Sequence, residues 1–156
     1  MRRLALPALL TLVFAPIGCG SEEATTPAAC LQGPGTFAEA LRDAPGQVRL
    51  AGETPISECL SENQSGGDLA TVGGAMVEVA TRLNAEARRD PGGDTTVQLG
   101  YLVGAANRGA GDTQGIHAEL VRRLESAALF SPAGKPPPPP FDQQYEKGYA
   151  AGRDGG

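Results

Sequence analysis

The chain has 156 residues and a formal net charge of −5. This length suits one modest domain, and the negative charge disfavours a surface that binds nucleic acid or another polyanion by electrostatic attraction. Leu, Ile, Val and Phe occur 23 times after residue 18, and 21 of these residues lie between Thr36 and Phe130. The hydrophobic core is therefore expected within residues 36–131.

The N-terminus has the features of an export signal. Two arginines precede residues 4–17, an apolar stretch that is too short and too often interrupted by proline to remain in a bilayer as a spanning helix. The sequence that follows, Ala-Pro-Ile-Gly-Cys at 15–19, resembles the lipobox of bacterial lipoproteins. The resemblance implies that residues 1–18 are a cleaved signal peptide and that Cys19 is the lipidated residue, carrying an acyl chain such as palmitate.

The lipobox also implies a location for the protein. It predicts an exported protein that is lipid-anchored to the outer face of the cell membrane or to the outer membrane, so that the membrane is a partner through the N-terminal lipid. Pro16 stands where the family usually has Leu, and a soluble secreted product is the alternative. Residues 20–29 contain no large apolar side chain, so residues 19–35 are predicted to form the lipidated Cys and a flexible tether.

Three cysteines in an exported chain leave one without a partner unless it has another role. If Cys19 carries lipid, Cys30 and Cys59 can form a disulfide. Closing that loop would stabilise the fold by roughly 3–4 kcal/mol on the chain-entropy model. The alternative is two free thiols, which an oxidising compartment disfavours.

The segment 36–131 predicts an all-α domain, a small helical bundle. A capping box at 36–39 predicts a short helix from Phe37 to about Asp43, and Thr54-Pro55 predicts one or two helical turns that point Cys59 inward. From Asp68 the apolar residues recur at steps of three and four, which predicts an amphipathic helix that ends near Asp90.

Two further helices are expected in the same domain. One covers residues 96–107 and should pair antiparallel with the helix before it, so that Ala80 meets Gly104 and Leu83 meets Tyr101. The spacing of Gly100 and Gly104 indicates a close approach of two helices. The other helix runs from about residue 114 to 130, with Ile116 among its inward-facing residues.

The last part of the chain reads as a linker followed by a short helix. Residues 132–140 are rich in proline, and the five prolines at 136–140 predict a polyproline II rod. Beyond them Phe141, Tyr145 and Tyr149 recur every fourth residue, so residues 141–156 are predicted to form an aromatic helix and tail. Burial of these rings should dock the helix on the bundle.

The sequence contains few groups that point to chemistry. His117 is the only histidine and lies beside apolar positions, so we expect it to be structural; no cofactor, metal site or catalytic residue is predicted. The leading hypothesis is a non-enzymatic interaction module whose partner is another envelope protein. The alternative is a small-molecule or peptide binder with a pocket beside the C-terminal aromatic helix, where Tyr101, Phe141, Tyr145 and Tyr149 supply contacts. A hydrolase would require His117 and an acid to converge.

The lipid anchor gives a direct prediction. We expect Cys19→Ala to abolish membrane association and to leave the folded domain intact, because a polar tether separates the acylated residue from the core. Sedimentation of membranes followed by immunoblotting measures the first effect, and circular dichroism of the soluble fraction measures the second. Ser21→Ala, two residues away, is the control and should stay with the membranes. Persistent membrane association of the Cys19→Ala protein would show that the lipobox interpretation is wrong.

Overall fold

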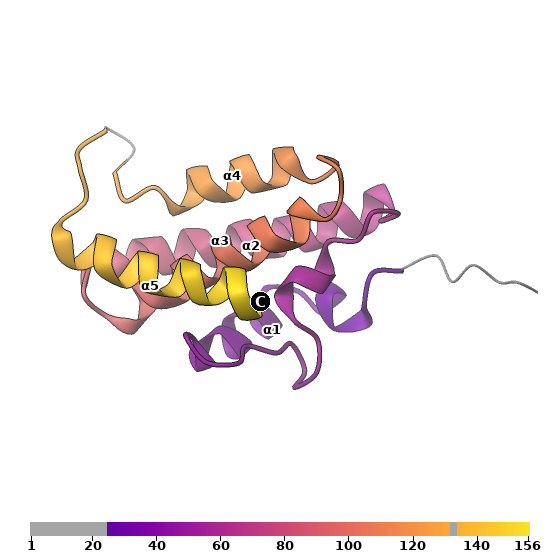
Figure 1. The fold of residues 1–156 in the computed structure, drawn as a ribbon, viewed down its shortest axis with the longest axis horizontal. Helices are drawn as coiled ribbons and strands as arrows, with labels where there is room; N and C mark the ends of the chain where they lie inside the picture. Colours follow the sequence, from indigo (N-terminus) through magenta and orange to yellow (C-terminus); the bar gives the residue numbers. More distant parts are fainter. Residues whose placement is uncertain (1–24, 132–133) are drawn as a thin grey trace, which may run out of the picture.

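The structure is a computed structural model that describes residues 25–131 and 134–156, and in these residues the fold is an all-α bundle, as the sequence predicts (Figure 1). The signal peptide and Cys19 lie outside the described residues. None of the helices in the described part is long and apolar enough to cross a membrane. The elements follow one another as η1 (Ala28–Leu31), α1 (Pro34–Ala40), η2 (Leu41–Asp43), η3 (Ile56–Cys59), α2 (Gly66–Ala87), α3 (Asp94–Gly111), α4 (Ala118–Ala128) and α5 (Pro139–Gly155).

Helix α2 forms for the reasons that the sequence suggests. The Ser65 side chain caps its first turn by accepting a hydrogen bond from the backbone N–H of Asp68 at 3.0 Å. The apolar side chains spaced three and four residues apart are buried along one face, from Val72 through Met76 and Val79 to Leu83. Helix α2 therefore supplies a central apolar face against which α1, α3 and α4 pack.

Glycines on α3 bring this helix into direct backbone contact with α5. A Cβ atom on Gly100 would overlap the carbonyl oxygen of Tyr145, and a Cβ on Gly104 would overlap the carbonyl oxygen of Tyr149. Because a step of four residues along α3 matches a step of four along α5, the two helices run parallel. Figure 1 shows them side by side, although α4 and the linker separate them in the chain.

The contact is reciprocal. A Cβ on Gly148 would overlap the carbonyl oxygen of Val97, and a Cβ on Gly152 would overlap that of Tyr101. The same short sequence, Gly-Tyr-x-x-Gly, occurs at 100–104 and at 148–152. The two helices thus present equivalent edges to each other, and each edge can approach so closely only because it lacks Cβ atoms.

This pairing corrects one expectation from the sequence. The close approach of Gly104 was expected to be to Ala80 on α2, but the glycine edge of α3 faces α5 instead. The predicted contact between Leu83 and Tyr101 assumes the same register of α2 against α3, so it no longer follows.

The start of α4 also differs from the sequence prediction. The helix begins at Ala118 and not near residue 114, because Gln114 and Gly115 have positive φ angles of 52° and 90°. Ile116 lies in this non-helical segment and is 52% exposed, so its predicted burial is wrong.

The C-terminal helix forms and packs on the bundle, as predicted. It begins at an earlier residue than predicted, and it also contacts the bundle through a second face. Pro139 and Pro140 occupy the first turn of α5, where the missing N–H groups cost nothing, so only residues 136–138 of the proline run precede the helix. Phe141 is buried, as expected. The closest contact with the bundle is nevertheless made by glycines and not by the predicted aromatic stripe.

A disulfide joins two segments of the N-terminal part. Cys30 in η1 and Cys59 in η3 are bonded, with Cα atoms 5.5 Å apart, and both residues are fully buried. This bond confirms the pairing that the sequence predicts. The bond joins two short 3₁₀ segments that could not be stable alone.

The glycine contact leads to a test with a matched control. Gly152→Ala would force the backbones of α3 and α5 apart, and we expect a loss of about 3 kcal/mol of stability or more. Gly74→Ala, in the interior of α2 with open space around it, should instead stabilise the protein by up to about 1 kcal/mol. Urea unfolding followed by circular dichroism measures both. Equal effects of the two substitutions would contradict the close contact.

Candidate binding groove

A groove of about 550 Å³ lies where the C-terminal end of α4, residues 134–137 and the first half of α5 come together. Its floor and walls are mainly aromatic and aliphatic, with charged groups among them. The described lining includes Val103, Glu125, Ala128, Leu129, Phe130, Gly134, Lys135, Pro136, Pro137, Phe141, Asp142, Tyr145, Glu146 and Tyr149.

Four aromatic rings form a continuous row along this groove. Phe130, just after α4, meets Phe141 edge to face, with ring centroids 4.8 Å apart. Phe141 and Tyr145 then lie nearly parallel at 5.7 Å, and Tyr145 and Tyr149 at 6.2 Å. Ring pairs at these separations attract each other beyond the effect of area burial, so the row is ordered by its own contacts.

The end of α4 is fixed by a buried side chain from α2. Asn84 is 4% exposed, and its Nδ2 donates hydrogen bonds to the carbonyl oxygens of Ala127 and Leu129, both at 2.8 Å. Arg88 donates a further bond to the Leu129 carbonyl at 3.1 Å. These bonds satisfy carbonyl groups that a helix end leaves free, and they hold Phe130 in place against α5.

The charges around the groove are unequal in sign. Glu125, Asp142 and Glu146 line it, whereas Lys135 is the one cation among the described lining residues. Burial raises the pKa of the Tyr145 hydroxyl well above its ordinary value, and Tyr149 and the carboxylates of Glu125 and Glu146 raise it further. The Tyr145 phenol therefore stays neutral and can donate a hydrogen bond at any physiological pH.

Three of the four residues predicted to bind a ligand line this groove, namely Phe141, Tyr145 and Tyr149. Tyr101 does not, because its side chain is fully buried and its hydroxyl lies near Val48 and Gly155. Burial raises the pKa of its hydroxyl, which lies near the Val48 backbone but makes no hydrogen bond of normal geometry with a described residue.

Sequence reasoning missed Phe130, Glu125 and Glu146 as parts of the groove. Glu125 and Glu146 look like ordinary solvated acids on their helices, and Phe130 reads as the last residue of a helix. Only the placement of α4 antiparallel to α5 brings these side chains together (Figure 1).

A second cavity of about 670 Å³ lies between η3 and the ends of α3 and α5. It is larger, but its lining mixes Arg49 and Arg108 with Glu58, Asp112 and Asp154. Arg108 already donates hydrogen bonds to the carbonyl oxygens of residues 153 and 154. Two guanidinium groups therefore face three carboxylates, one guanidinium is already in use, and the described lining of this cavity contains no aromatic side chain. We place the candidate site in the aromatic groove.

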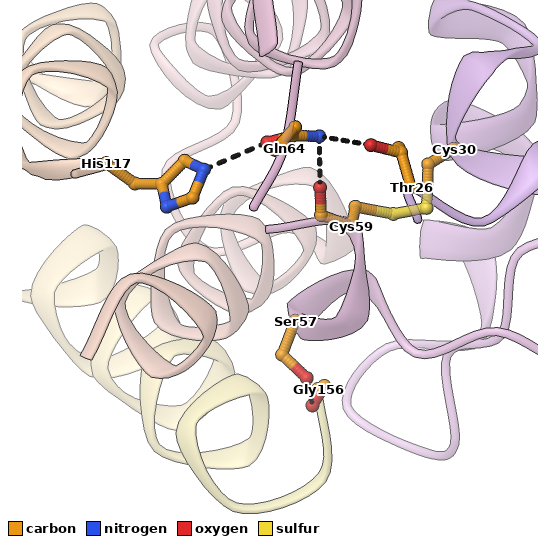
Figure 2. The surroundings of a disulfide bond; sticks show 7 residues. All are labelled: Thr26, Cys30, Ser57, Cys59, Gln64, His117 and Gly156. Carbon is orange, nitrogen blue, oxygen red and sulfur yellow. Dashed lines mark hydrogen bonds between the residues drawn. A yellow bond between two sulfur atoms is a disulfide. The ribbon is translucent and has the colours of Figure 1, made fainter. Parts of the chain in front are cut away.

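His117 belongs to a buried polar network beside the disulfide, drawn in Figure 2. Its Nδ1 lies 2.8 Å from the Thr113 hydroxyl and its Nε2 lies 2.9 Å from Gln64 Oε1. Gln64 in turn donates from Nε2 to the carbonyl oxygen of Cys59 at 2.9 Å and to the hydroxyl of Thr26 at 3.0 Å. The network links the loop before α4 to the segment in which the described chain begins.

The network fixes the proton on the imidazole. The Gln64 amide must turn its NH₂ group toward the Cys59 carbonyl, so its oxygen faces His117. This oxygen accepts a hydrogen bond from the Nε2–H group of the imidazole. Full burial of the ring lowers the pKa of His117, since the charged form would lose its hydration. His117 is therefore neutral at pH 7 and acts in packing, as the sequence suggests.

The groups that a hydrolase would need do not converge. The ring nitrogens of His117 contact Thr113 and Gln64 and not a carboxylate. Ser57 donates its hydroxyl to the carbonyl oxygen of Gly156 and points away from His117 in Figure 2. In residues 25–131 and 134–156, no three His, Cys, Asp or Glu side chains are placed to hold a metal ion.

Comparison with known proteins adds no relative: no protein-family model, curated protein or solved structure matches this chain.

The buried histidine makes stability depend on pH. The unfolded chain takes up a proton on His117 near pH 6.5, whereas the folded protein does so only at lower pH. Stability should therefore fall as the pH drops from 7.5 towards 5.5. His117→Gln should lower the melting temperature at pH 7.5 and flatten its dependence on pH in this window. Thermal unfolding at both pH values tests this, and because the chain has one histidine, parallel curves for the two proteins would refute it.

Proposed function

We propose that this chain is a non-catalytic binding domain, lipid-anchored in the cell envelope, that holds a small, largely apolar organic molecule in the aromatic groove. The observation that carries the proposal is the groove itself, about 550 Å³ in volume and walled by four aromatic side chains. Binding sites for small molecules have volumes of a few hundred to about a thousand Å³ and combine apolar walls with a few polar groups.

The groove favours this function over the leading hypothesis from the sequence. An interaction module that uses its C-terminal helix only as a cover should have a filled interface between the helix and the bundle. Along α3 the interface is filled, because glycine backbones touch there. Beside the aromatic row it is open, with Tyr145 and Tyr149 half-buried at its edge. The open side supports a ligand site.

The polar groups of the groove suit recognition more than reaction. Beside the carboxylates of Glu125, Asp142 and Glu146, the described lining of the groove contains no histidine and no cysteine. Its one serine is Ser131, and no histidine of the lining is available to activate it. The Tyr145 phenol is held neutral, as a donor. Such groups can orient a ligand, and nothing in their arrangement activates a water or a nucleophile.

The proposal is tested with N-phenyl-1-naphthylamine, an uncharged aromatic dye that fluoresces in apolar sites. The Cys19→Ala protein is used, because acyl chains also take up the dye. We expect saturable binding that weakens about tenfold or more in Tyr145→Ala, since the ring between Phe141 and Tyr149 in the aromatic row is removed.

The control is Ile116→Ala, which removes an exposed apolar side chain on the loop before α4. It should leave the affinity unchanged, and the melting temperatures of both variants show whether they remain folded. The proposal fails if the dye does not bind, or if Ile116→Ala weakens binding as much as Tyr145→Ala does.

A further inference from the structure

We propose that the aromatic groove is selective for small molecules that carry an organic cation, such as a quaternary ammonium group attached to an apolar body. This inference rests on the proposed function and names the chemical class of its ligand. It follows from the charges and the rings that the fold brings to the same surface.

Three carboxylates and one ammonium line the groove, so its formal charge is −2. Glu125 comes from α4, whereas Asp142 and Glu146 come from α5, so the acids approach the groove from two separate elements. None of them forms an ion pair with a described residue; Glu125 only accepts a long hydrogen bond of 3.4 Å from Asn107. The negative charge is therefore available to a ligand.

The aromatic rings of the groove also attract cations. A cation beside the face of a tyrosine or phenylalanine is attracted by the ring quadrupole, and the attraction grows when the site excludes water. Tyr145 lies between Phe141 and Tyr149 in the aromatic row and is close enough to Glu125 and Glu146 for both to disfavour its phenolate. The two carboxylates that disfavour a negative charge at this point favour a positive one. Burial, the larger cause of the raised pKa of Tyr145, disfavours any strongly hydrated charge, so the cation must be weakly hydrated.

A compact, weakly hydrated cation fits these features better than a metal ion or a plain ammonium. Metal ions need several oxygen ligands at fixed short distances, and in the described residues no group of three possible ligands is so arranged. An alkylated ammonium loses little hydration when it enters an apolar site, and its methyl groups pack against rings. Lys135 lies at the same groove and is the natural competitor for the carboxylates.

The experiment compares benzyltrimethylammonium with its uncharged isostere, neopentylbenzene, by ligand-observed NMR titration of the purified protein. The two probes share size and shape, so a difference in affinity measures the effect of charge alone. We expect the cation to bind at least about fivefold more tightly. The Glu125→Gln/Glu146→Gln variant should remove most of this preference, and Lys135→Gln should increase it.

Glu53→Gln is the matched control, because it removes one negative charge from an exposed site that is not part of the groove. It should leave the preference unchanged. Equal affinities for the two probes, or a preference that survives the double substitution, would overturn the inference while dye binding leaves the proposed function standing. Failure of the dye and of both probes to bind would refute the proposed function as well.

Discussion

The backbone contact between α3 and α5 is the constraint on which the rest of the structure depends. Gly100 and Gly104 on one helix, and Gly148 and Gly152 on the other, remove the side chains that would keep the two backbones apart. The aromatic stripe of α5 is centred roughly 40° around the helix from its glycine edge, since 3.6 residues make a turn. Once the glycine edge is fixed against α3, the aromatic rings must face the end of α4. The groove is a consequence of that rotation.

A core with few large apolar residues needs such short-range contacts. In residues 25–65 the helical elements are three 3₁₀ turns and the short helix α1, and the disulfide and the hydrogen bonds of Gln64 tie these segments to one another. His117 completes this junction by donating to Gln64 from the segment before α4. These bonds add to the burial of Phe37, Leu41 and Ile56 in the core, in keeping with the small size of the chain.

Sequence reasoning succeeds here where the signal is local. The periodic apolar face of α2, the pair Cys30 and Cys59, and the regular spacing of Phe141, Tyr145 and Tyr149 all lie within short stretches or follow from simple counting. It fails where the structure depends on which of two helices packs against a given residue. Gly104 clearly indicates a close approach, but a glycine carries no information about which helix approaches, and α2 is nearer in the chain than α5. Glu125 and Phe130 join the groove only because of that long-range choice.

The groove lies far from the point at which the described chain begins. Along the longest axis of the molecule, the described chain begins near one end, whereas residues 134–138 and the start of α5 lie at the other (Figure 1). Thr26 and Cys30 are buried, so the folded domain begins inside the segment 19–35 that the sequence predicts to be a tether. The disulfide and the Gln64 network hold these first residues to the segment before α2. The N-terminal end of the described domain therefore does not obstruct the aromatic row.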